Sequence, residues 1–236
     1  MNWKIIHIDE TDSTNRWLRA HGDGSSELVV VADYQTAGRG CGTNTWESER
    51  GKNLLFSVLI HPTDIFANEQ FRITMAASVA VCQALQPFIS EKVAIKWPND
   101  IYVGDKKICG MLIENVLHGN VIKASIIGIG LNVNQTEFKS DAPNPVSLRQ
   151  LTGKETDLEM MLQAFLRAFK ATYYDKTTCF TYKSMLYRRE KYAIYRDKTS
   201  CFTATLTNVL PDGRLLLVDK DGQERLYAFK EVQFII

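Results

Sequence analysis

The sequence predicts an α+β protein, in which a large domain of strands and helices precedes a small all-β domain. Short apolar runs such as 28-LVVVADY-34 have the length of buried strands. Apolar residues between Leu158 and Tyr173 recur at helical spacing. The last part of the chain consists of short strands separated by turns that contain Asp-Gly. We therefore expect a large domain over 1–182 and a small β-barrel domain over 183–236.

The large domain is expected to begin with strands around one short and one long helix. Residues 3–8 predict a strand, and Ser13 is a candidate N-cap for a short helix over Thr14–Ala20. A largely apolar helix is predicted over Phe71–Phe88, where Pro87 favours its end. Between the two helices, buried strands are predicted over 28–34 and 54–60.

Paired strands and a core helix are expected to complete the large domain. Val93–Trp97 is predicted as a strand that ends in the turn Pro98–Asp100. The helical spacing noted above predicts an amphipathic helix, which we assign to the core. Strands over 107–117 and 121–133, joined at His118-Gly119-Asn120, are expected to pair. In the small domain, strands are predicted over 202–210, 214–221 and 224–232.

Composition and charge exclude several classes of protein. Of the 236 residues, 45% are hydrophobic and 23% are charged, which is ordinary for a globular protein and unlike a disordered chain. The formal net charge of +1 gives no reason to expect binding to DNA or to a membrane surface. The five cysteines lack C-x-x-C spacing, and no apolar run approaches the roughly 18 residues that span a bilayer. We therefore expect a reduced, cytoplasmic protein.

A glycine-rich loop is the first candidate for chemistry. In 38-GRGCGTNTW-46 the glycines let backbone N–H groups approach a ligand, and Arg39 offers a fork of donors for a carboxylate or phosphate. The loop leads into a strand and not into a helix, so the dinucleotide-binding fingerprint does not apply. A plain surface hairpin is the alternative, which the preceding buried strand and Trp46 make less favourable.

The second candidate combines 96-KWPND-100 with 105-DKKICG-110. Lys107 begins an apolar run, so its ammonium group can reach inward from a strand end toward a carboxylate or phosphate oxygen. Asp100 can hold Mg²⁺ or anchor the turn. Lys106, in contrast, fits a solvated turn.

Two further motifs have a structural interpretation beside a functional one. The glycines of 128-GIGLNVN-134 are typical of a bulge or of close backbone approach, and Asn132 needs partners if it is buried. The segment 12-DSTN-15 has the pattern of a helix cap. Cys41 lies beside Arg39 and is a candidate activated thiol, but no histidine is near it in the sequence.

Together these segments resemble the biotin protein ligases, and the resemblance covers almost the whole chain. It rests on 13-STN-15, 34-YQTAGRG-40 with Trp46, 96-KWPNDIYVGDKKICGMLIEN-115 and 128-GIGLNVN-134. The K-W-P-N-D element followed by D-x-K-x-x-G is its most specific part. The resemblance implies a mixed β-sheet backed by helices, of the class II synthetase-like biotin/lipoate ligase type, with a small SH3-like barrel at the C-terminus.

The resemblance also implies a reaction and a role for each motif. ATP and biotin, with Mg²⁺, form biotinyl-5′-AMP, and biotin then passes to one lysine of a biotin carboxyl carrier domain. Lys107 would be the main catalytic residue, with Arg39 beside it, and Asp100 would be the metal ligand. The glycines at 38, 110 and 130 would wall in the valeryl tail, and Trp46 would pack on adenine. Biotin would be bound by Ser13, Thr14, Asn15, Gln35, Gly38, Arg39, Gly40, Cys41, Lys107 and Gly110, and ATP by Asn44, Trp46, Lys96, Asp100 and Asn132.

The chain departs from the family pattern in two places. Many bacterial members carry an N-terminal helix-turn-helix, for which motifs that begin at residue 13 leave no room, so we expect no DNA partner. Many members have a second Arg in the glycine loop where this chain has Cys41, which predicts looser retention of the adenylate. Members occur as monomers and as homodimers, and the sequence favours neither.

Three other functions stay open at this point. A lipoate ligase or octanoyl transferase shares the catalytic fold, and the transferase would use a thiol such as Cys41 or Cys109, whereas the K-W-P-N-D element favours biotin. A sensor of biotin or nucleotide that does no chemistry would not need both Lys107 and Arg39. A DNA-binding repressor lacks the expected domain and charge.

Overall fold

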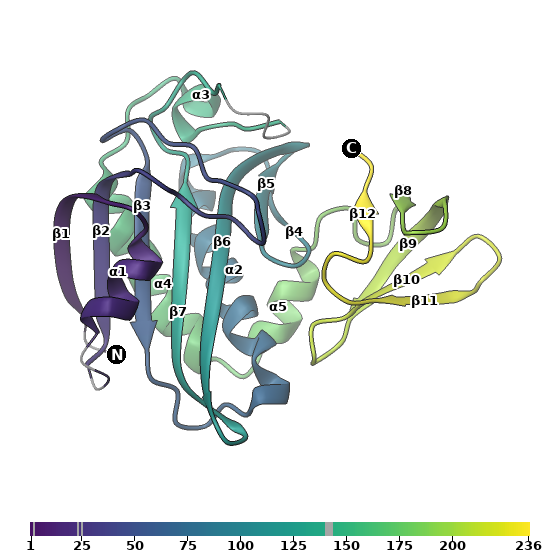
Figure 1. The fold of residues 1–236 in the computed structure, drawn as a ribbon. Coiled ribbons are helices and arrows are strands. Elements are labelled where there is room, and N and C mark those ends of the chain that lie inside the picture. Colours follow the sequence, from purple (N-terminus) through teal and green to yellow (C-terminus); the bar gives the residue numbers. More distant parts are fainter. Residues whose placement is uncertain (2, 23, 25, 140–143) are drawn as a thin grey trace.

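Two β-sheets make up the framework of the computed structural model, which describes residues 1, 3–22, 24, 26–139 and 144–236 (Figure 1). The larger sheet has seven strands in the order β1-β2-β3-β7-β6-β5-β4. Its strands β1 (Lys4–Thr11) and β2 (Leu28–Gln35) are parallel, and all its other neighbours are antiparallel. The mixed sheet that was predicted is therefore confirmed.

The remaining elements follow the predicted order, with additions. The other strands of the large sheet are β3 (Leu54–Ile60), β4 (Val93–Lys96), β5 (Asp100–Val103), β6 (Lys106–His118) and β7 (Val121–Leu131). The helices are α1 (Thr14–His21), α2 (Phe71–Leu85), α3 (Leu148–Thr152), α4 (Leu158–Tyr174) and α5 (Thr178–Ser184), with short 3₁₀ turns η1 (Ala67–Glu69) and η2 (Gln86–Phe88).

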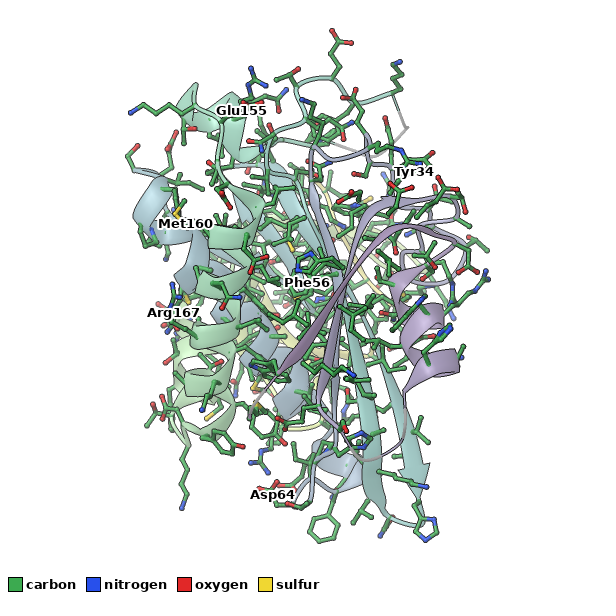
Figure 2. The ribbon with its side chains drawn as sticks, turned by 90° about the vertical axis from the view of Figure 1, so that its left-hand side faces the viewer. Tyr34, Phe56, Asp64, Glu155, Met160 and Arg167 are labelled. Carbon is green, nitrogen blue, oxygen red and sulfur yellow. The ribbon has the colours of Figure 1, made fainter. Side chains whose placement is uncertain are left out.

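The two faces of the large sheet are covered differently. Helices α2, α4 and α5 pack together on one face, while α1 lies on the other against β2, β3 and β7. Figure 2 shows the sheet edge-on, with the helix that carries Met160 and Arg167 on one side and α1 on the other. Because both faces of β3 are covered, every residue of this strand is buried, which explains its unbroken apolar run. Its alternation sends Phe56 against Phe165 of α4, at 5.1 Å between ring centroids, and Ser57 toward α1.

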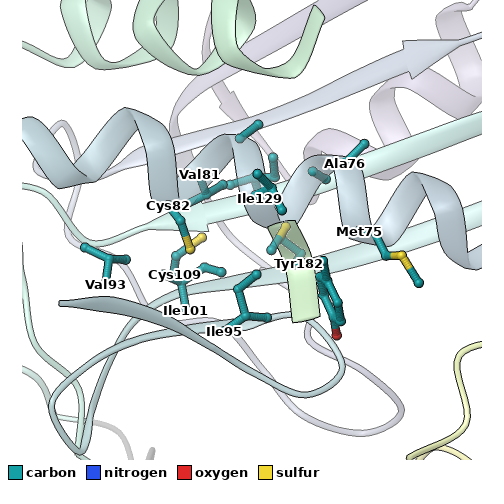
Figure 3. Close-up of a cluster of buried hydrophobic side chains, with 14 of the residues drawn as sticks. Met75, Ala76, Val81, Cys82, Val93, Ile95, Ile101, Cys109, Ile129 and Tyr182 are labelled. Atoms are coloured by element: carbon teal, nitrogen blue, oxygen red, sulfur yellow. The ribbon is translucent and has the colours of Figure 1, made fainter. Parts of the chain in front are cut away.

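The main core fills the space between α2 and the large sheet (Figure 3). Cys82 of α2, Cys109 of β6 and Ile129 of β7 meet there, all less than 5% exposed. Tyr182 of α5 is fully buried and donates a hydrogen bond to the carbonyl oxygen of Pro98, at 2.7 Å. This bond ties α5 to the turn between β4 and β5, which matters because that turn carries motif residues.

The smaller sheet is antiparallel, with the order β11-β10-β9-β8-β12. Its strands are β8 (Tyr192–Arg196), β9 (Cys201–Val209), β10 (Leu215–Asp219), β11 (Glu224–Tyr227) and β12 (Gln233–Phe234). Within 192–236, all of which is described, no backbone pairing joins β11 to β12, so hydrogen bonds do not close the expected barrel. The division of the chain after residue 182 falls inside α5 and stays a prediction.

The smaller sheet is attached to the larger one through a few specific contacts. The indole nitrogen of Trp97 donates a hydrogen bond to the carbonyl oxygen of Gly213, at 2.9 Å. Gly213 has a φ of +91°, and a Cβ there would contact the ring of Phe71. Tyr187, between the sheets, packs its ring 5.5 Å from Tyr102 and donates a hydrogen bond to Asp105. The turn before β10, at Gly213, and the segment between the sheets, at Tyr187, thus both contact β4, β5 and the turns beside them, which carry the K-W-P-N-D motif.

Several elements differ from the sequence-based expectation. The helix predicted over Phe71–Phe88 ends as an α-helix at Leu85 and continues as a 3₁₀ turn, because Pro87 cannot donate the next helical bond. Of the predicted strand over 224–232, only Glu224–Tyr227 forms a strand, β11, and the next strand, β12, begins beyond the predicted range at Gln233. Strands β5 and β8 and helices α3 and α5 were not expected. None of the described helices is long and apolar enough to cross a membrane.

Candidate active site

A cavity of about 1080 Å³ opens on the same side of the large sheet as α1. Its walls come from the start of α1, the glycine loop, the turn between β4 and β5, and the middles of β6 and β7. The end of the chain, after β11, supplies the remaining wall. The structure brings nearly all predicted site residues to this cavity; of them only Gly38 does not line it. The lining members are Ser13, Thr14, Asn15, Gln35, Arg39, Gly40, Cys41, Asn44, Trp46, Lys96, Asp100, Lys107, Gly110 and Asn132.

One end of the cavity holds a buried cluster of amides and hydroxyls. The amide oxygen of Gln35 accepts bonds from the backbone N–H and the hydroxyl of Thr14, at 2.8 and 3.1 Å. The hydroxyl of Ser57 lies 2.7 Å from both Thr14 Oγ1 and Asn15 Oδ1. Ser13 occupies the N-cap position of α1, but its side chain makes no capping bond. The helix-cap interpretation is therefore correct for the backbone position of Ser13, but its side chain does not cap the helix and lines the cavity instead.

Glu114 joins this cluster to the glycine loop. Its Oε2 accepts a hydrogen bond from Asn15 Nδ2 at 2.9 Å, and its Oε1 lies 3.5 Å from Arg39 and 3.1 Å from Arg19. The carboxylate is about one-fifth exposed, so solvent screens these pairs only partly. Sequence reasoning did not select Glu114. A lone acidic residue within the apolar run of β6 was the available signal, and Ser57 within β3 was a similar one.

Glycines clear a strip of backbone along β6 and β7. Gly110 and Gly130 are paired in register, and the indole of Trp46 lies on both of them. A Cβ at Gly110 would come within 2.8 Å of the indole, and one at Gly130 would overlap it. Gly128, two pairs further along, faces the amide of Asn15 in the same way. The glycines thus serve close approach, as the sequence indicated, but here the partner of Gly130 is Trp46 itself.

Lys107 lies at the other end of this strip. Its Nζ is 2.7 Å from Asp100 Oδ1, and both side chains are about a quarter exposed, at 26% and 28%. Its backbone is fixed on both sides, since its N–H donates to Asn144 and its carbonyl accepts from Val146. The Nζ atom also lies 5.8 Å from the centre of the Trp46 ring. A cation is therefore held in one place at the cavity wall.

Lys96 supplies a second cation from a more buried position. Its Nζ lies 5.2 Å from the ring centre of Tyr102 and 5.5 Å from that of Phe234. Burial lowers the pKa of Lys96, and the negative charge of Asp100 offsets part of this effect. No carboxylate of the described residues lies within ion-pair distance of Lys96, so a bound anion could pair directly with its ammonium group.

The glycine loop is a tight hairpin that borders the cavity. Gly40 donates its N–H to Asn44 at 2.8 Å, and Trp46 donates to Gly38 at 2.9 Å. Gly42, at the tip, has a φ of +73°. The hairpin alternative therefore describes the local structure, and the loop lines the cavity; that it binds a ligand stays a prediction. Cys41 is partly exposed at the cavity edge.

Two buried polar atoms in the cavity wall lack a hydrogen-bond partner among the described residues. Within the described part of the chain, no group is within hydrogen-bond distance of Trp46 Nε1 or Asn132 Oδ1. Asn132 is anchored through Nδ2, which donates to the Val146 carbonyl at 3.1 Å. Buried polar atoms normally have partners, so an unpaired donor and an unpaired acceptor at a cavity wall are suited to a polar ligand.

The side chains of the cavity limit how a metal ion could bind there. Among the described residues, no cluster of three or more His, Cys, Asp and Glu side chains could hold a metal ion. Glu47 and Asp100 are the carboxylates of the described cavity wall, so Mg²⁺ there would need phosphate oxygens as further ligands.

Cys109 is fully buried in the core, and burial raises the pKa of its thiol well above the usual range. Cys109 is therefore excluded as the nucleophile of a transferase.

The end of the chain contributes residues that the sequence did not indicate. Those lining the cavity are Phe229, Lys230, Val232, Gln233 and Phe234. They follow the last hairpin of the small sheet, and their sequence looks like that of an ordinary strand end. Only the packing of the two sheets against each other brings them to the site.

Comparison with known proteins agrees with this geometry. The model of the biotin/lipoate A/B protein ligase family matches residues 7–132. The bifunctional ligase/repressor BirA of Bacillus spizizenii is 32% identical over 97% of this chain, which spans 73% of that protein. The biotin–[acetyl-CoA-carboxylase] ligase of Mycobacterium tuberculosis is 29% identical over 72% of this chain, and the match spans 64% of its own length. The structure of the Aquifex aeolicus biotin protein ligase with biotin and ATP has 26% identity and a TM-score of 0.81, and the match covers 98% of each chain.

Proposed function

This chain belongs to the biotin/lipoate A/B protein ligase family, and we propose that it is a biotin–[acetyl-CoA-carboxylase] ligase. It activates biotin with ATP to biotinyl-5′-AMP and transfers the biotinyl group to a lysine of a biotin carboxyl carrier domain. The lipoate alternative is less well supported, because the Mycobacterium tuberculosis relative and the Aquifex aeolicus structure are named as ligases for biotin.

The arrangement along β6 and β7 carries this proposal. Donors and acceptors around Asn15 suit a cyclic urea, which presents two N–H groups and one carbonyl oxygen. The strip of Gly110 and Gly130 suits an unbranched apolar tail, and Lys107 stands where the carboxylate at the end of that tail would arrive. Trp46 lies on the strip, so we propose that its indole moves outward to admit the tail and then packs against the ligand.

Activation joins two anions, and the cations of the site make this possible. An oxygen of the biotin carboxylate attacks the α-phosphorus of ATP, a C–O–P bond forms, and the bond to pyrophosphate breaks. Lys107 and Arg39 stabilise the negative charge that develops at the reacting oxygens. Arg39 is held by Glu114, and Lys107 by Asp100, so each cation is in place before substrates bind.

The nucleotide is proposed to bind at the side of the cavity nearer β4 and β5. Lys96 would pair with phosphate oxygens, and the unpaired Asn132 Oδ1 would accept from the adenine amino group. Mg²⁺ fits as a partner of Asp100 and the phosphates, where it would neutralise phosphate charge. Asn44 and Trp46 would complete the nucleotide pocket from the loop.

Transfer needs less from the protein. The amine of the acceptor lysine attacks the carbonyl carbon of the adenylate, an amide bond forms, AMP leaves, and the amine proton passes to solvent. Holding the two reactants together accounts for most of this step. We propose a carrier domain as the protein partner and a cytoplasmic location, which the five free cysteines support. With a net charge of +1, DNA is not proposed as a partner.

Mass spectrometry of a carrier domain tests the proposal. The domain is incubated with this protein, Mg·ATP and either biotin or lipoate. We expect a mass gain of one biotin on a single lysine and no gain with lipoate, and the same preference in acid-dependent pyrophosphate exchange. A gain with lipoate alone would contradict the substrate assignment, and no AMP release with either acid would contradict the enzymatic one.

A further inference from the structure

A lysine from the end of the chain rests on the tip of the glycine loop. Lys230 places its ammonium group directly on Gly42, so that a Cβ at position 42 would overlap Nζ. The two residues are separated by most of the chain and belong to different halves of the structure. Gly42 at this position therefore allows the loop tip and the segment after β11 to touch.

The backbone at Lys230 is held in an unusual conformation. Its φ is +70°, in the left-handed region that residues with a side chain seldom adopt. Neighbouring contacts fix it there: Phe229 packs edge-on against Trp97, with ring centroids 6.2 Å apart, and the backbone of Glu231 donates to Ala228. Such conformations persist where the surroundings determine them, and they cluster at ligand clamps.

Lys230 has an exposed side chain. No carboxylate of the described residues lies within ion-pair distance of its Nζ, which is 5.9 Å from the ring centre of Phe229. Lys107 and Arg39 each have an acidic partner in the same cavity. Among the described residues Lys230 is thus a solvent-exposed cation at the cavity wall with no ion-pair partner, beside the loop position where Cys41 replaces the Arg that is common in the family.

We propose that Lys230 latches the glycine loop over the bound acyl-adenylate and supplies the positive charge that Cys41 does not. This makes Lys230 a positioning residue for the loop and a partner for a phosphate oxygen of the intermediate. It rests in part on the proposed function, since the adenylate is the anion to be retained. It also changes the expectation from the sequence: retention need not be looser, because a different element carries the charge.

The test uses the full chain and matched substitutions. Lys230→Asn removes the charge while keeping a residue that tolerates a positive φ. Lys230→Arg keeps the charge, and Lys220→Asn removes an exposed lysine elsewhere on the small sheet. Two quantities are measured: release of preformed biotinyl-5′-AMP, and hydrogen exchange of the loop amides of Gly40 and Trp46.

We expect Lys230→Asn to release the adenylate roughly tenfold faster or more, as for loss of one charged hydrogen bond. Its loop amides should exchange faster, whereas Lys230→Arg and Lys220→Asn should resemble the native protein. Adding Cys41→Arg should restore retention in Lys230→Asn and change it little in the native background.

The proposal is overturned if Lys230→Asn alters neither release nor loop exchange. It is equally overturned if Cys41→Arg slows release by the same factor in both backgrounds, because the two positions would then be independent. A native protein that forms no adenylate would refute the proposed ligase activity instead, and loop exchange in the four proteins would still decide whether Lys230 holds the loop.

Discussion

Lys107 and Asp100 form an ion pair across two neighbouring strands, with 2.7 Å between Nζ and Oδ1. The pair lies at the edge of the cavity, where each side chain keeps some exposure to solvent. An incoming carboxylate or phosphate therefore meets a lysine that is already oriented, and a magnesium ion meets a carboxylate that is already ordered. Because each charge is paired with the other, neither Lys107 nor Asp100 is left as an unpaired charge in the cavity before substrates bind.

Substitution Lys107→Ala should abolish adenylate formation while the protein stays folded. Removing one preorganised donor from a charged transition state lowers the rate by roughly 10²–10³-fold. Biotin-dependent pyrophosphate exchange measures this, and circular dichroism checks the fold. Lys106→Ala, at the exposed neighbouring position, is the control and should keep near-native exchange. Near-native exchange by Lys107→Ala would refute its catalytic role.

Substitution Gly128→Ala should weaken biotin binding through Asn15. The new methyl group would overlap the Asn15 amide, so the amide must leave its bonds to Ser57 and Glu114. We expect a rise of about tenfold in the Kd for biotin by calorimetry. Asn15→Ala should show a similar defect, and the double variant should be no worse than either single one. Fully additive effects would place the action of Gly128 elsewhere.

Glu114→Ala should also weaken biotin binding, although Glu114 was not selected from the sequence. Its carboxylate holds both Asn15 and Arg39, and loss of a charged hydrogen bond costs about 1.5–3 kcal/mol. A tenfold or greater rise in the Kd for biotin is expected. Glu224→Ala, on the exposed surface of β11, serves as the control. An unchanged Kd would show that Asn15 and Arg39 keep their places without this carboxylate.

Asp197 should make the small sheet sensitive to acid. Hydrogen bonds from Thr199, Ser200 and Tyr227 hold the pKa of its carboxyl far below the ordinary value of 3.8. Since the pKa is lower in the folded state, the stabilisation is complete above 3.8 and is lost as the pH falls below it. The difference in urea midpoint between the native protein and Asp197→Asn should therefore be largest near neutral pH and shrink in acid. A difference that is independent of pH would contradict this.

The parts of the fold that could be predicted are those with strong local patterns. The run of β3 and the spacing in α4 each repeat one physical requirement over many residues, so their bounds were predicted closely. Strand β5 was missed because its first residue, Asp100, was assigned to the preceding turn, and β8 was missed because it lies before the turns that marked the small domain. The small barrel was expected from short strands with hairpin turns and from the family resemblance, and neither fixes which edge strands pair.

The candidate site divides in the same way. Lys107 and Arg39 stand in motifs whose residue types suit only a few kinds of chemistry, so the sequence indicated them. Glu114 and Ser57 look like single polar exceptions in apolar strands, and only their contacts reveal a shared role. Lys230 has no local signal, because its position depends on how two sheets pack.

Strand β6 carries both ends of the candidate site, with Glu114 near one and Lys107 at the other. A strand is nearly inextensible, rising about 3.3–3.4 Å per residue, so the number of residues between them sets a fixed span. If biotin binds along this strand as proposed, the strand fixes the distance between the groups that hold the two ends of the substrate. An acid whose ring is seated beside Asn15 but whose tail is one methylene shorter would present its carboxylate short of Lys107, and a longer one would have to buckle. Discrimination among acids with the same ring would then depend on this backbone span as well as on the side chains at its two ends.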